Sequence, residues 1–571
     1  MDETRPDLDA ILPFLPLVDR SSSLFWPSRV VDALKALSEG PDFSGVDSGV
    51  LLFDVIIEIR HALGLSRERL DPNAAEGYAL FFDEFIGRVE SRKWFEDTVP
   101  ALATLMLRLP SLLEEHYQKA DTIVFQAKDG SVVKTGLRIL GPQESGIVIL
   151  SQELIGSLLS CSLFCLFPVV HRDSKDLPLI NFDQLFGCLC ASGRPSQEHK
   201  LKCLKHYFER ICCSMPKGSV SFERKVLPFE QSHLGVGYPD TIFWAKSVAP
   251  LCSFTVFEEG FIEDQHLDAL EVDFANSYIG GGALRTGCVQ EEIRFMINPE
   301  LIVAMLFLPS MVDNEAIEIV GAERFSSYGG YGSSFVFLGD FLDKSNLDSL
   351  GRQKTRIVAI DALCYPRSKQ YKVQGLIRET NKAFCGFLDH SDRVKCQKIF
   401  RKGILPGDGF VQDISSVNTG SSGTQQARTC LGHSGEPDCP VSSTSTEQSS
   451  ERSGDVILTE NSNQEYNQAP EVEENIGVAT GNWGCGAFGG DPEIKSVIQW
   501  LACSQALRPF LLYYTFGEMT LSRLEEVSQW ILSHGWTVGD LWDMLVEYSS
   551  KRLKGETHLG FFAWLLPPAP Q

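Results

Sequence analysis

Apolar residues recur at three- and four-residue intervals through much of the first 220 positions of the chain. This spacing places them on one face of an α-helix and predicts helices over Ser28–Leu37, Val50–Leu63, Ala79–Val89 and Phe95–Leu113. The apolar stretch Leu154–Val170 is uncharged, but it has 17 residues and contains a proline, whereas a membrane-spanning helix needs about 20. We therefore expect residues 1–218 to form a helical accessory domain, with a buried core helix at this stretch.

After Pro216, short β-type runs begin to alternate with helical patterns. Strand character is found at Ser219–Val226, Leu251–Phe257, Leu270–Phe274, Ala316–Val320, Arg356–Ile360, Ile476–Thr480 and Leu511–Phe516. Helical patterns lie at Pro299–Phe307, Val373–Phe384, Pro492–Ala506 and Leu521–Tyr548. Strands that alternate with helices are typical of an α/β sheet covered on both faces. The sequence thus predicts a second domain over residues 219–402 and 476–571, with helices at its C-terminal end.

Residues 403–475 differ in composition from the segments on either side. They are rich in Ser, Thr, Gln, Gly and Asn, and they contain 12 acidic residues against 2 arginines. A segment of this kind cannot bury enough apolar surface to fold by itself. We expect a disordered acidic insertion that interrupts the second domain and is dispensable for its chemistry.

The chain has 571 residues, a formal net charge of −24 and 16 cysteines. The negative charge argues against a general nucleic-acid binder that neutralises many phosphates. The cysteines include no C-x-x-C pair, so no zinc site is expected, and they are too few for a disulfide scaffold. The first residues contain no apolar signal segment. These features predict reduced thiols and a location in the nucleus and cytoplasm.

A triple glycine, Gly280–Gly282, follows a β-type run and is separated by seven residues from the triplet Gln290–Glu292. Successive glycines let the backbone approach a ligand closely. Adjacent glutamates at a helix start usually do no more than complement the helix dipole. Asp273 and Asn276 lie in the same short segment, however, and this density of polar groups favours a catalytic loop.

A second glycine-rich loop, Gly481–Pro492, lies between a strand pattern and a helix that Asp491 is placed to cap. A strand, a glycine loop and a helix N-terminus together can cradle phosphate. Gly484, Gly486 and Gly489 also fit the dinucleotide fingerprint, although that fingerprint normally opens its domain rather than closing it. A structural turn is the alternative interpretation. The aromatic residues of Gly321–Gly332, including Tyr331, could stack on a base or pack in the core.

Taken together, these segments resemble poly(ADP-ribose) glycohydrolase of the eukaryotic type. The resemblance is carried by Val272–Asn276, Gly280–Gly282, Gln290–Glu292, Phe295–Leu301, Gly481–Asp491 and Thr515–Gly517. It implies a macrodomain-like mixed α/β sheet flanked by helices, preceded by an N-terminal all-helical accessory domain. It also implies poly(ADP-ribose) and poly(ADP-ribosyl)ated proteins as partners, ADP-ribose as product, and neither a cofactor nor a metal.

The resemblance further implies roles for individual residues. Glu292 is expected to be the catalytic acid and base, Glu291 and Gln290 to hold ribose hydroxyls, and Asp273 and Asn276 to order the catalytic loop. The implied substrate-binding residues are Gly280, Gly281, Gly282, Asn276, Gln290, Tyr331, Gly484, Cys485, Gly486, Ala487, Phe488, Phe516 and Glu258. Among them the loop from Gly484 is expected to hold the diphosphate and Phe488 to lie against the ribose. Tyr331, Phe516 and Glu258 are expected to hold the adenine, and Arg285 has no assigned role.

Neighbouring residues on a helix point about 100° apart, so Glu291 and Glu292 are not expected to face the scissile bond together. One carboxyl would then act twice, first as acid and then as base. Two other functions remain open on the sequence alone. A macrodomain that reads ADP-ribose without hydrolysing it needs the glycine loop but not Glu292. A nucleotide-dependent oxidoreductase would use the loop at Gly484, but the acidic partner of that fingerprint is missing.

Overall fold

The computed structural model describes residues 5–20, 23–122, 125–126, 132–190, 195–227, 238–265, 267–343, 347–348, 350–390, 396, 399–400 and 476–567. The segment 403–475, which the sequence predicts to be a disordered insertion, lies outside the described residues. The chain on either side of that segment forms one compact unit.

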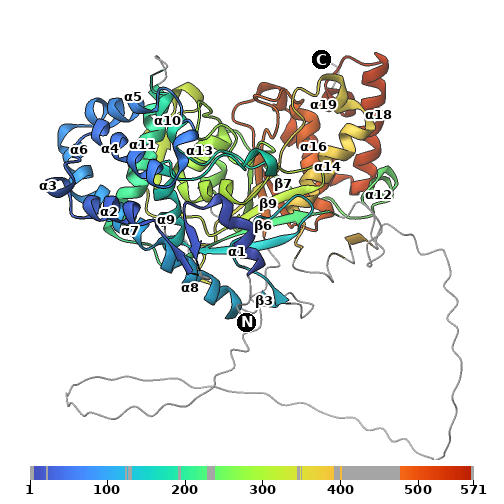
Figure 1. Ribbon diagram of the computed structural model, residues 1–571. Coiled ribbons are helices and arrows are strands. Elements are labelled where there is room, and N and C mark those ends of the chain that lie inside the picture. The colour runs from blue at the N-terminus through green and yellow to red at the C-terminus, as the bar shows by residue number, and fades with distance from the viewer. Residues whose placement is uncertain are drawn as a thin grey trace, which may run out of the picture. The chain divides into compact units, whose positions relative to one another are not determined.

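The N-terminal part is helical, as the sequence predicts, and it gathers at one side of the molecule (Figure 1). Its helices are α1 (Pro6–Ile11), α2 (Ser28–Ser38), α3 (Pro41–Ser44), α4 (Gly49–Ala62), α5 (Ala74–Ala79), α6 (Arg88–Lys93), α7 (Val99–Leu107), α8 (Leu109–Thr122), α9 (Gln152–Leu163), α10 (Asp183–Gly187) and α11 (Pro195–Cys213). Two π-helical turns, Leu80–Phe85 and Trp94–Thr98, continue α5 and α6. Strand β1 (Val18–Arg20) pairs antiparallel with β2 (Ser23–Phe25), and β3 (Phe125–Gln126) pairs antiparallel with β4 (Val132–Val133).

Helix α9 is the buried core helix expected in the apolar stretch 154–170. The Ser151 hydroxyl caps it by accepting a hydrogen bond from Leu154 N, and every residue from Gln152 to Leu163 except Glu153 is buried. The helix ends at Leu163, earlier than the apolar stretch, because Cys165 adopts a left-handed backbone conformation (φ 54°) ahead of the proline. Within the described residues, no helix is long and apolar enough to cross a membrane.

An eight-stranded mixed sheet forms the centre of the molecule, in the order β5-β6-β9-β12-β8-β13-β14-β7. The strands are β5 (Gly146–Ser151), β6 (Ser219–Val226), β7 (Ser253–Phe257), β8 (Ala269–Asp273), β9 (Glu315–Val320), β12 (Arg356–Ala359), β13 (Gly477–Gly481) and β14 (Phe510–Tyr514). The five strands from β12 to β7 are parallel, and the pairs β5–β6, β6–β9 and β9–β12 are antiparallel. Each strand predicted from the sequence is present. Strand β5 was not predicted, and it extends the sheet from within the helical part.

Helices cover both faces of this sheet (Figure 1). One core joins the N-terminal helices to α13 (Gln290–Ile297), and it includes Ile317 and Ile319 of β9. The other core lies under α12 (Thr241–Ala245), α14 (Val373–Phe387), α16 (Pro492–Gln505), α17 (Leu524–Ser533), α18 (Val538–Lys554) and α19 (Phe561–Leu565). Alternate residues of one strand point to opposite faces, so Ala316 of β9 enters this second core. The segment Pro299–Leu306, predicted to be helical, is a 3₁₀-helix.

The parallel strands place the predicted functional loops at one edge. In the register of the sheet, the ends of β8, β13, β14 and β7 lie next to one another. The catalytic loop follows β8, the glycine loop follows β13, and Phe516 follows β14. Ligands of open α/β sheets bind at the carboxyl ends of parallel strands. A small hairpin of β10 (Ser326–Gly329) and β11 (Val336–Asp340) carries Tyr331 in its turn.

Candidate active site

Glu291 at the start of α13 is tied to the beginning of the catalytic loop. Its carboxylate accepts hydrogen bonds from the backbone N–H groups of Gly280 (2.6 Å) and Asn276 (2.9 Å). Gly281 has a left-handed backbone (φ 48°), and a Cβ atom there would lie 2.5 Å from Glu291 Oε2. A side chain at position 281 would therefore displace the carboxylate, which explains why glycine is needed at this point of the loop.

Glu292 closes the other end of the same loop. Its Oε1 accepts from Gly282 N (2.9 Å) and its Oε2 accepts from Val289 N (2.8 Å). The second contact reaches back to the residue that precedes α13, which is the way a glutamate in a capping box stabilises a helix start. Glu292 remains 7% exposed. The two glutamates thus bind different halves of the loop, as the angular separation of neighbouring helical residues requires.

Gln290 connects the same helix to the end of β8 and to the hairpin. Its side chain accepts a hydrogen bond from Phe274 N (2.8 Å) and donates one to Val272 O (3.1 Å). Its backbone N–H donates to the hydroxyl of Tyr331 (3.3 Å). The side-chain amide of Gln290 is therefore hydrogen-bonded to backbone groups in this structure, whereas the resemblance implies that it binds ribose hydroxyls. The Tyr331 side chain stays 55% exposed.

Asp273, the last residue of β8, is buried beside the two glutamates, and neither of its oxygens has a hydrogen-bond partner among the described residues. Burial raises the pKa of Asp273 to about 8; the Arg294 guanidinium opposes this rise and Glu292 adds to it. Burial, together with Asp273 and Glu292, also raises the pKa of Glu291 well above its usual range. Burial and neighbouring like charges disfavour the ionised form of a carboxyl, so Asp273 and Glu291 together hold at least one proton near neutral pH.

The helical part also contacts the catalytic loop, and this was not predicted from the sequence. Lys200 of α11 is fully buried, and its ammonium donates to the carbonyls of Arg285 (2.6 Å) and Gly287 (2.6 Å). Burial lowers the pKa of Lys200 to about 8. Gln197 donates to Thr286 O (3.2 Å). The Arg285 side chain, to which the sequence assigned no role, donates to Gln184 of the helical part (2.6 Å).

The glycine loop after β13 presents backbone amides without acceptors. Among the described residues, the N–H groups of Gly486, Ala487 and Phe488 make no hydrogen bond. Asp491 Oδ1 caps the following helix, α16, by accepting from Glu493 N (3.0 Å). Consecutive free amides next to a helix N-terminus form an anion site. The geometry therefore agrees with the expected diphosphate cradle, and Cys485 adds no thiolate to it because burial raises the pKa of its thiol.

Buried side chains and backbone groups support the glycine loop. Gly484 has a left-handed backbone (φ 73°), and a Cβ atom there would lie 2.5 Å from Cβ of Ala362. The Lys495 ammonium lies 3.8 Å from the centre of the Trp483 ring and is paired with Glu379 of α14. The Trp483 indole donates to Ile360 O (2.8 Å). The loop is thus fixed by the chain that leaves β12.

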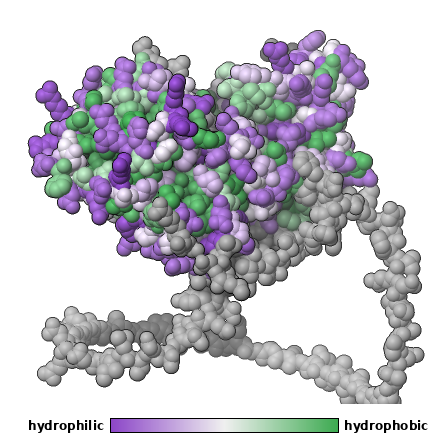
Figure 2. Space-filling model, viewed as in Figure 1, coloured by the Kyte–Doolittle hydropathy of each residue, from purple (hydrophilic) through white to green (hydrophobic). Residues whose placement is uncertain are grey.

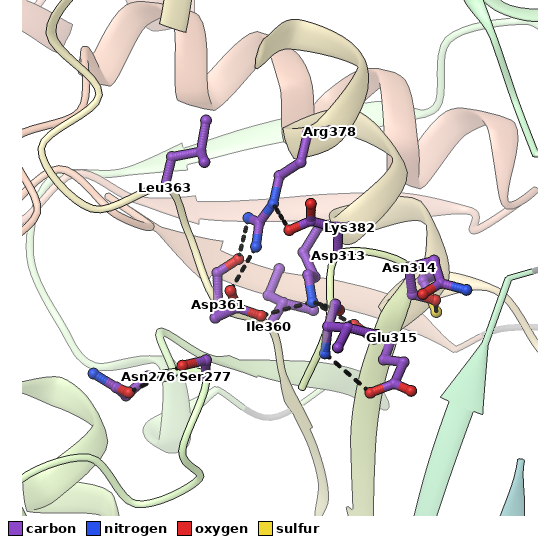
Figure 3. A network of polar contacts seen from close by, with 12 residues as sticks. Asn276, Ser277, Asp313, Asn314, Glu315, Ile360, Asp361, Leu363, Arg378 and Lys382 are labelled. Atoms are coloured by element: carbon purple, nitrogen blue, oxygen red, sulfur yellow. Dashed lines mark hydrogen bonds and ion pairs between the residues drawn. The ribbon is translucent and has the colours of Figure 1, made fainter. Parts of the chain in front are cut away.

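That exit from β12 is held in turn by ion pairs with α14. Figure 3 shows Arg378 and Lys382 reaching Asp361 from one side of the helix. Arg378 donates to the backbone and the carboxylate of Asp361, and Lys382 pairs with the same carboxylate at 2.6 Å. Arg378 also contacts Asp313 at 2.9 Å. These contacts fix the chain that leaves β12 against α14.

Two of the residues expected to hold the adenine, Phe516 and Glu258, lie at the same edge of the sheet as the catalytic and glycine loops. Thr515 N donates to Phe257 O (2.8 Å), which brings Phe516 next to the end of β7, where Glu258 is exposed. Phe516 has a left-handed backbone (φ 52°) and is 45% exposed. The structure thus brings the expected site residues to one edge. Within the described residues there is no His, Cys, Asp and Glu cluster that could hold a metal ion.

Comparison with known proteins agrees with this architecture. Residues 86–224 match the family model for the helical domain of poly(ADP-ribose) glycohydrolase (PARG), and residues 241–523 match the model for its Macro domain fold. "Poly(ADP-ribose) glycohydrolase 1" of Arabidopsis thaliana is 54% identical over 567 residues, covering 99% of this chain and 98% of that protein. This chain belongs to the poly(ADP-ribose) glycohydrolase family. The resemblance found in the sequence is therefore confirmed.

Other members of the family are similar to this chain over most of their length. "Probable poly(ADP-ribose) glycohydrolase 2" of Arabidopsis thaliana is 50% identical over 564 residues, which are 99% of each protein. "Poly(ADP-ribose) glycohydrolase 2" of Caenorhabditis elegans is 29% identical over 467 residues, covering 78% of this chain and 74% of that one. The strands from β7 to β14 thus lie within the match to the Macro domain fold of this family. Helices α6 to α11 lie within the match to its helical domain, together with β5 and most of β6.

Proposed function

We propose that this protein is a poly(ADP-ribose) glycohydrolase that cleaves the O-glycosidic bond between riboses and releases ADP-ribose. The observation that carries the proposal is the pair of adjacent glutamates, each bonded to one half of the triple-glycine loop. Poly(ADP-ribosyl)ated proteins would be its natural substrates. By family, we also propose a role in the DNA damage response, in the nucleus and cytoplasm. A fluorescent fusion of the full chain tests the location.

In the proposed mechanism Glu292 acts as both acid and base. It gives its proton to the leaving ribose oxygen as the glycosidic bond breaks, and it then takes a proton from the water that adds to the anomeric carbon. The raised pKa values of Asp273 and Glu291 mean that the cluster holds protons near neutral pH. Diphosphate bound by the free amides of the glycine loop would place negative charge near the cationic ribose and stabilise it.

The amino acids beside Glu292 would position the substrate. Glu291 and Asn276 lie at the start of the loop and Phe488 at the end of the glycine loop, so the distal ribose would lie between them. Tyr331 and Phe516 would hold the adenine at the far end. Glu258 is exposed and near Phe516, which is compatible with contact to the adenine amine.

Incubation of the full chain with labelled poly(ADP-ribose) tests the proposal directly, with free ADP-ribose as the expected product. Glu292→Gln should reduce kcat by at least ~10²–10⁴-fold, the range for a lost acid–base group, while ADP-ribose still binds in calorimetry. Glu291→Gln is the matched comparison, and it should also weaken substrate positioning. Near-normal hydrolysis by Glu292→Gln would transfer the catalytic role to Glu291 or Asp273. A parent protein that binds ADP-ribose but releases none from polymer would be a reader.

A further inference from the structure

The chain that leaves β12 contains surface residues with no role in the site described so far. Two non-glycine residues here, Tyr365 (φ 46°) and Arg367 (φ 45°), have left-handed backbones, a conformation that such residues rarely adopt. Tyr365 is 68% exposed. Backbone strain of this kind persists only where surrounding contacts fix it. The segment is therefore held in place while its side chains remain in solvent.

The contacts that fix the segment come from the glycine loop. Tyr365 N donates to Phe488 O (2.9 Å), and the Gln370 side chain accepts from Asp491 N (2.7 Å). The Tyr371 hydroxyl donates to the Asp491 carboxylate (2.7 Å). The segment thus forms the outer wall of the proposed diphosphate cradle.

The same wall begins at the base of the catalytic loop. Ile360 N donates to Asp273 O (3.3 Å), and the following residues are anchored by Arg378 and Lys382 (Figure 3). A substrate that passes out between the catalytic loop and Phe488 would therefore meet this segment next.

The segment is also positively charged, in a chain whose formal net charge is −24. Arg367, Lys369 and Lys372 are exposed, and within the described residues none of them forms an ion pair. The acidic residue at the start of the segment, Asp361, is already paired with Arg378 and Lys382. An exposed aromatic ring beside unpaired cations matches the chemistry of a nucleotide, whose base stacks and whose phosphates are anionic.

We propose that Cys364–Lys372 is a second subsite, which binds the ADP-ribose unit preceding the terminal one in a poly(ADP-ribose) chain. Tyr365 stacks on the adenine of that unit, and the three cations contact its diphosphate and the next. The subsite rests on the proposed function of the neighbouring loops. The subsite also predicts that polymer binding weakens moderately with salt, although the enzyme is acidic. Each phosphate contact on a single strand contributes ~0.7 to the slope of log(affinity) against log[salt].

The test compares two sets of variants in the full chain. The triple variant Arg367→Asn, Lys369→Gln, Lys372→Gln removes the charge, and asparagine tolerates the left-handed backbone. The control triple Lys35→Gln, Arg88→Gln, Lys93→Gln removes three exposed cations of the helical part. We expect the first set to raise KM for long polymer about tenfold at low salt. The slope of log(kcat/KM) against log[salt] should fall by about 2, while kcat and the Kd for free ADP-ribose stay within about twofold.

A second comparison isolates the ring. Tyr365→Asn should raise KM for polymer about tenfold and Tyr365→Phe should not, because stacking depends on the ring face. Three outcomes would overturn the subsite: equal slopes for both triple variants, a loss of ADP-ribose affinity parallel to the rise in KM, or inhibition by single-stranded RNA as strong as by poly(ADP-ribose). If the parent releases no ADP-ribose, the proposed function fails by itself. Polymer binding by fluorescence anisotropy then still decides the subsite.

Discussion

Substitution of Lys200 tests whether the helical domain positions the catalytic loop. Lys200→Met keeps the length of the buried side chain but removes both hydrogen bonds to the carbonyls of Arg285 and Gly287. Bonds from a charged donor contribute ~1.5–3 kcal/mol each, or ~3–6 kcal/mol for two. Against this, the drop in the Lys200 pKa from 10.5 to about 8 corresponds to ~3 kcal/mol for keeping the charge buried. The net loss of stability should therefore be ~0–3 kcal/mol.

The substitution should also slow catalysis. The loop released by Lys200→Met includes Val289 and Gly282, whose N–H groups hold the Glu292 carboxylate. Small displacements of reacting groups cost up to ~10²-fold in rate, so kcat for polymer should fall by ~10–100-fold with a smaller change in KM. Lys202→Met on the same helix is the matched control, because its ion pair joins it to Glu198 of α11 itself.

The assay is steady-state release of ADP-ribose from labelled polymer, run beside thermal unfolding of each variant. The reasoning is refuted if Lys200→Met keeps kcat within about twofold of the parent while its melting temperature falls. That result would make Lys200 a stabilising contact between the domains and nothing more. A fall in kcat shared equally by Lys202→Met would likewise remove the special role of the two carbonyl contacts.

Three further predictions follow from the site. Tyr331→Ala should weaken ADP-ribose binding by ~1–3 kcal/mol in calorimetry. Tyr331→Phe should weaken binding little, because the 3.3 Å hydrogen bond from Gln290 N to the Tyr331 hydroxyl is weak. Equal losses of affinity in both variants would show that the hydroxyl, and not the ring, binds the ligand. The pKa of Asp273 is about 8 in the folded protein and 3.8 for an ordinary aspartate. The folded state therefore favours the protonated carboxyl, and this contribution to stability is complete below pH 3.8 and is lost as pH rises through 8. Relative to Asp273→Asn, the parent should therefore lose unfolding free energy over that window in denaturant titrations, and parallel curves would contradict this. Replacement of 403–475 by a short Gly-Ser linker should leave turnover unchanged, and a fall of about a hundredfold with the fold intact would assign this segment to the site.

Much of the central fold could be predicted because its strands are apolar runs bounded by glycine, proline or polar residues. Ser219–Val226 was predicted with the bounds the structure gives, and the other strands differ by one or two residues at their ends. Strand β5 was missed because a short apolar run cannot be distinguished from a helical segment by periodicity. Its pairing with β6 decides its conformation, and that pairing is not visible in the local sequence.

The residues of the site also fall into two groups, those that the local sequence could indicate and those that only the packing of the domains brings into place. The glycines and glutamates are close together in the sequence, so their density was a usable signal, and their resemblance to a known family located the loops. Lys200 gave no such signal, since a lysine on an amphipathic helix normally faces solvent. Its contact with Gly287 depends on how the helical domain packs against the sheet. The hydrogen bond from Arg285 to Gln184 was hidden for the same reason.

The order of the strands in the sheet has a consequence for how the protein is made. Strand β8 lies between β12 and β13, yet roughly 200 residues separate its last residue, Asp273, from the first residue of β13, Gly477. At a synthesis rate of ~5–20 residues per second, a ribosome needs about 10 to 40 s to produce the missing neighbour. Throughout that interval one edge of β8 is unpaired in the nascent chain, and open strand edges are where chains associate wrongly. The strand that ends in Asp273 is therefore the place where we expect a chaperone to protect this enzyme during its synthesis.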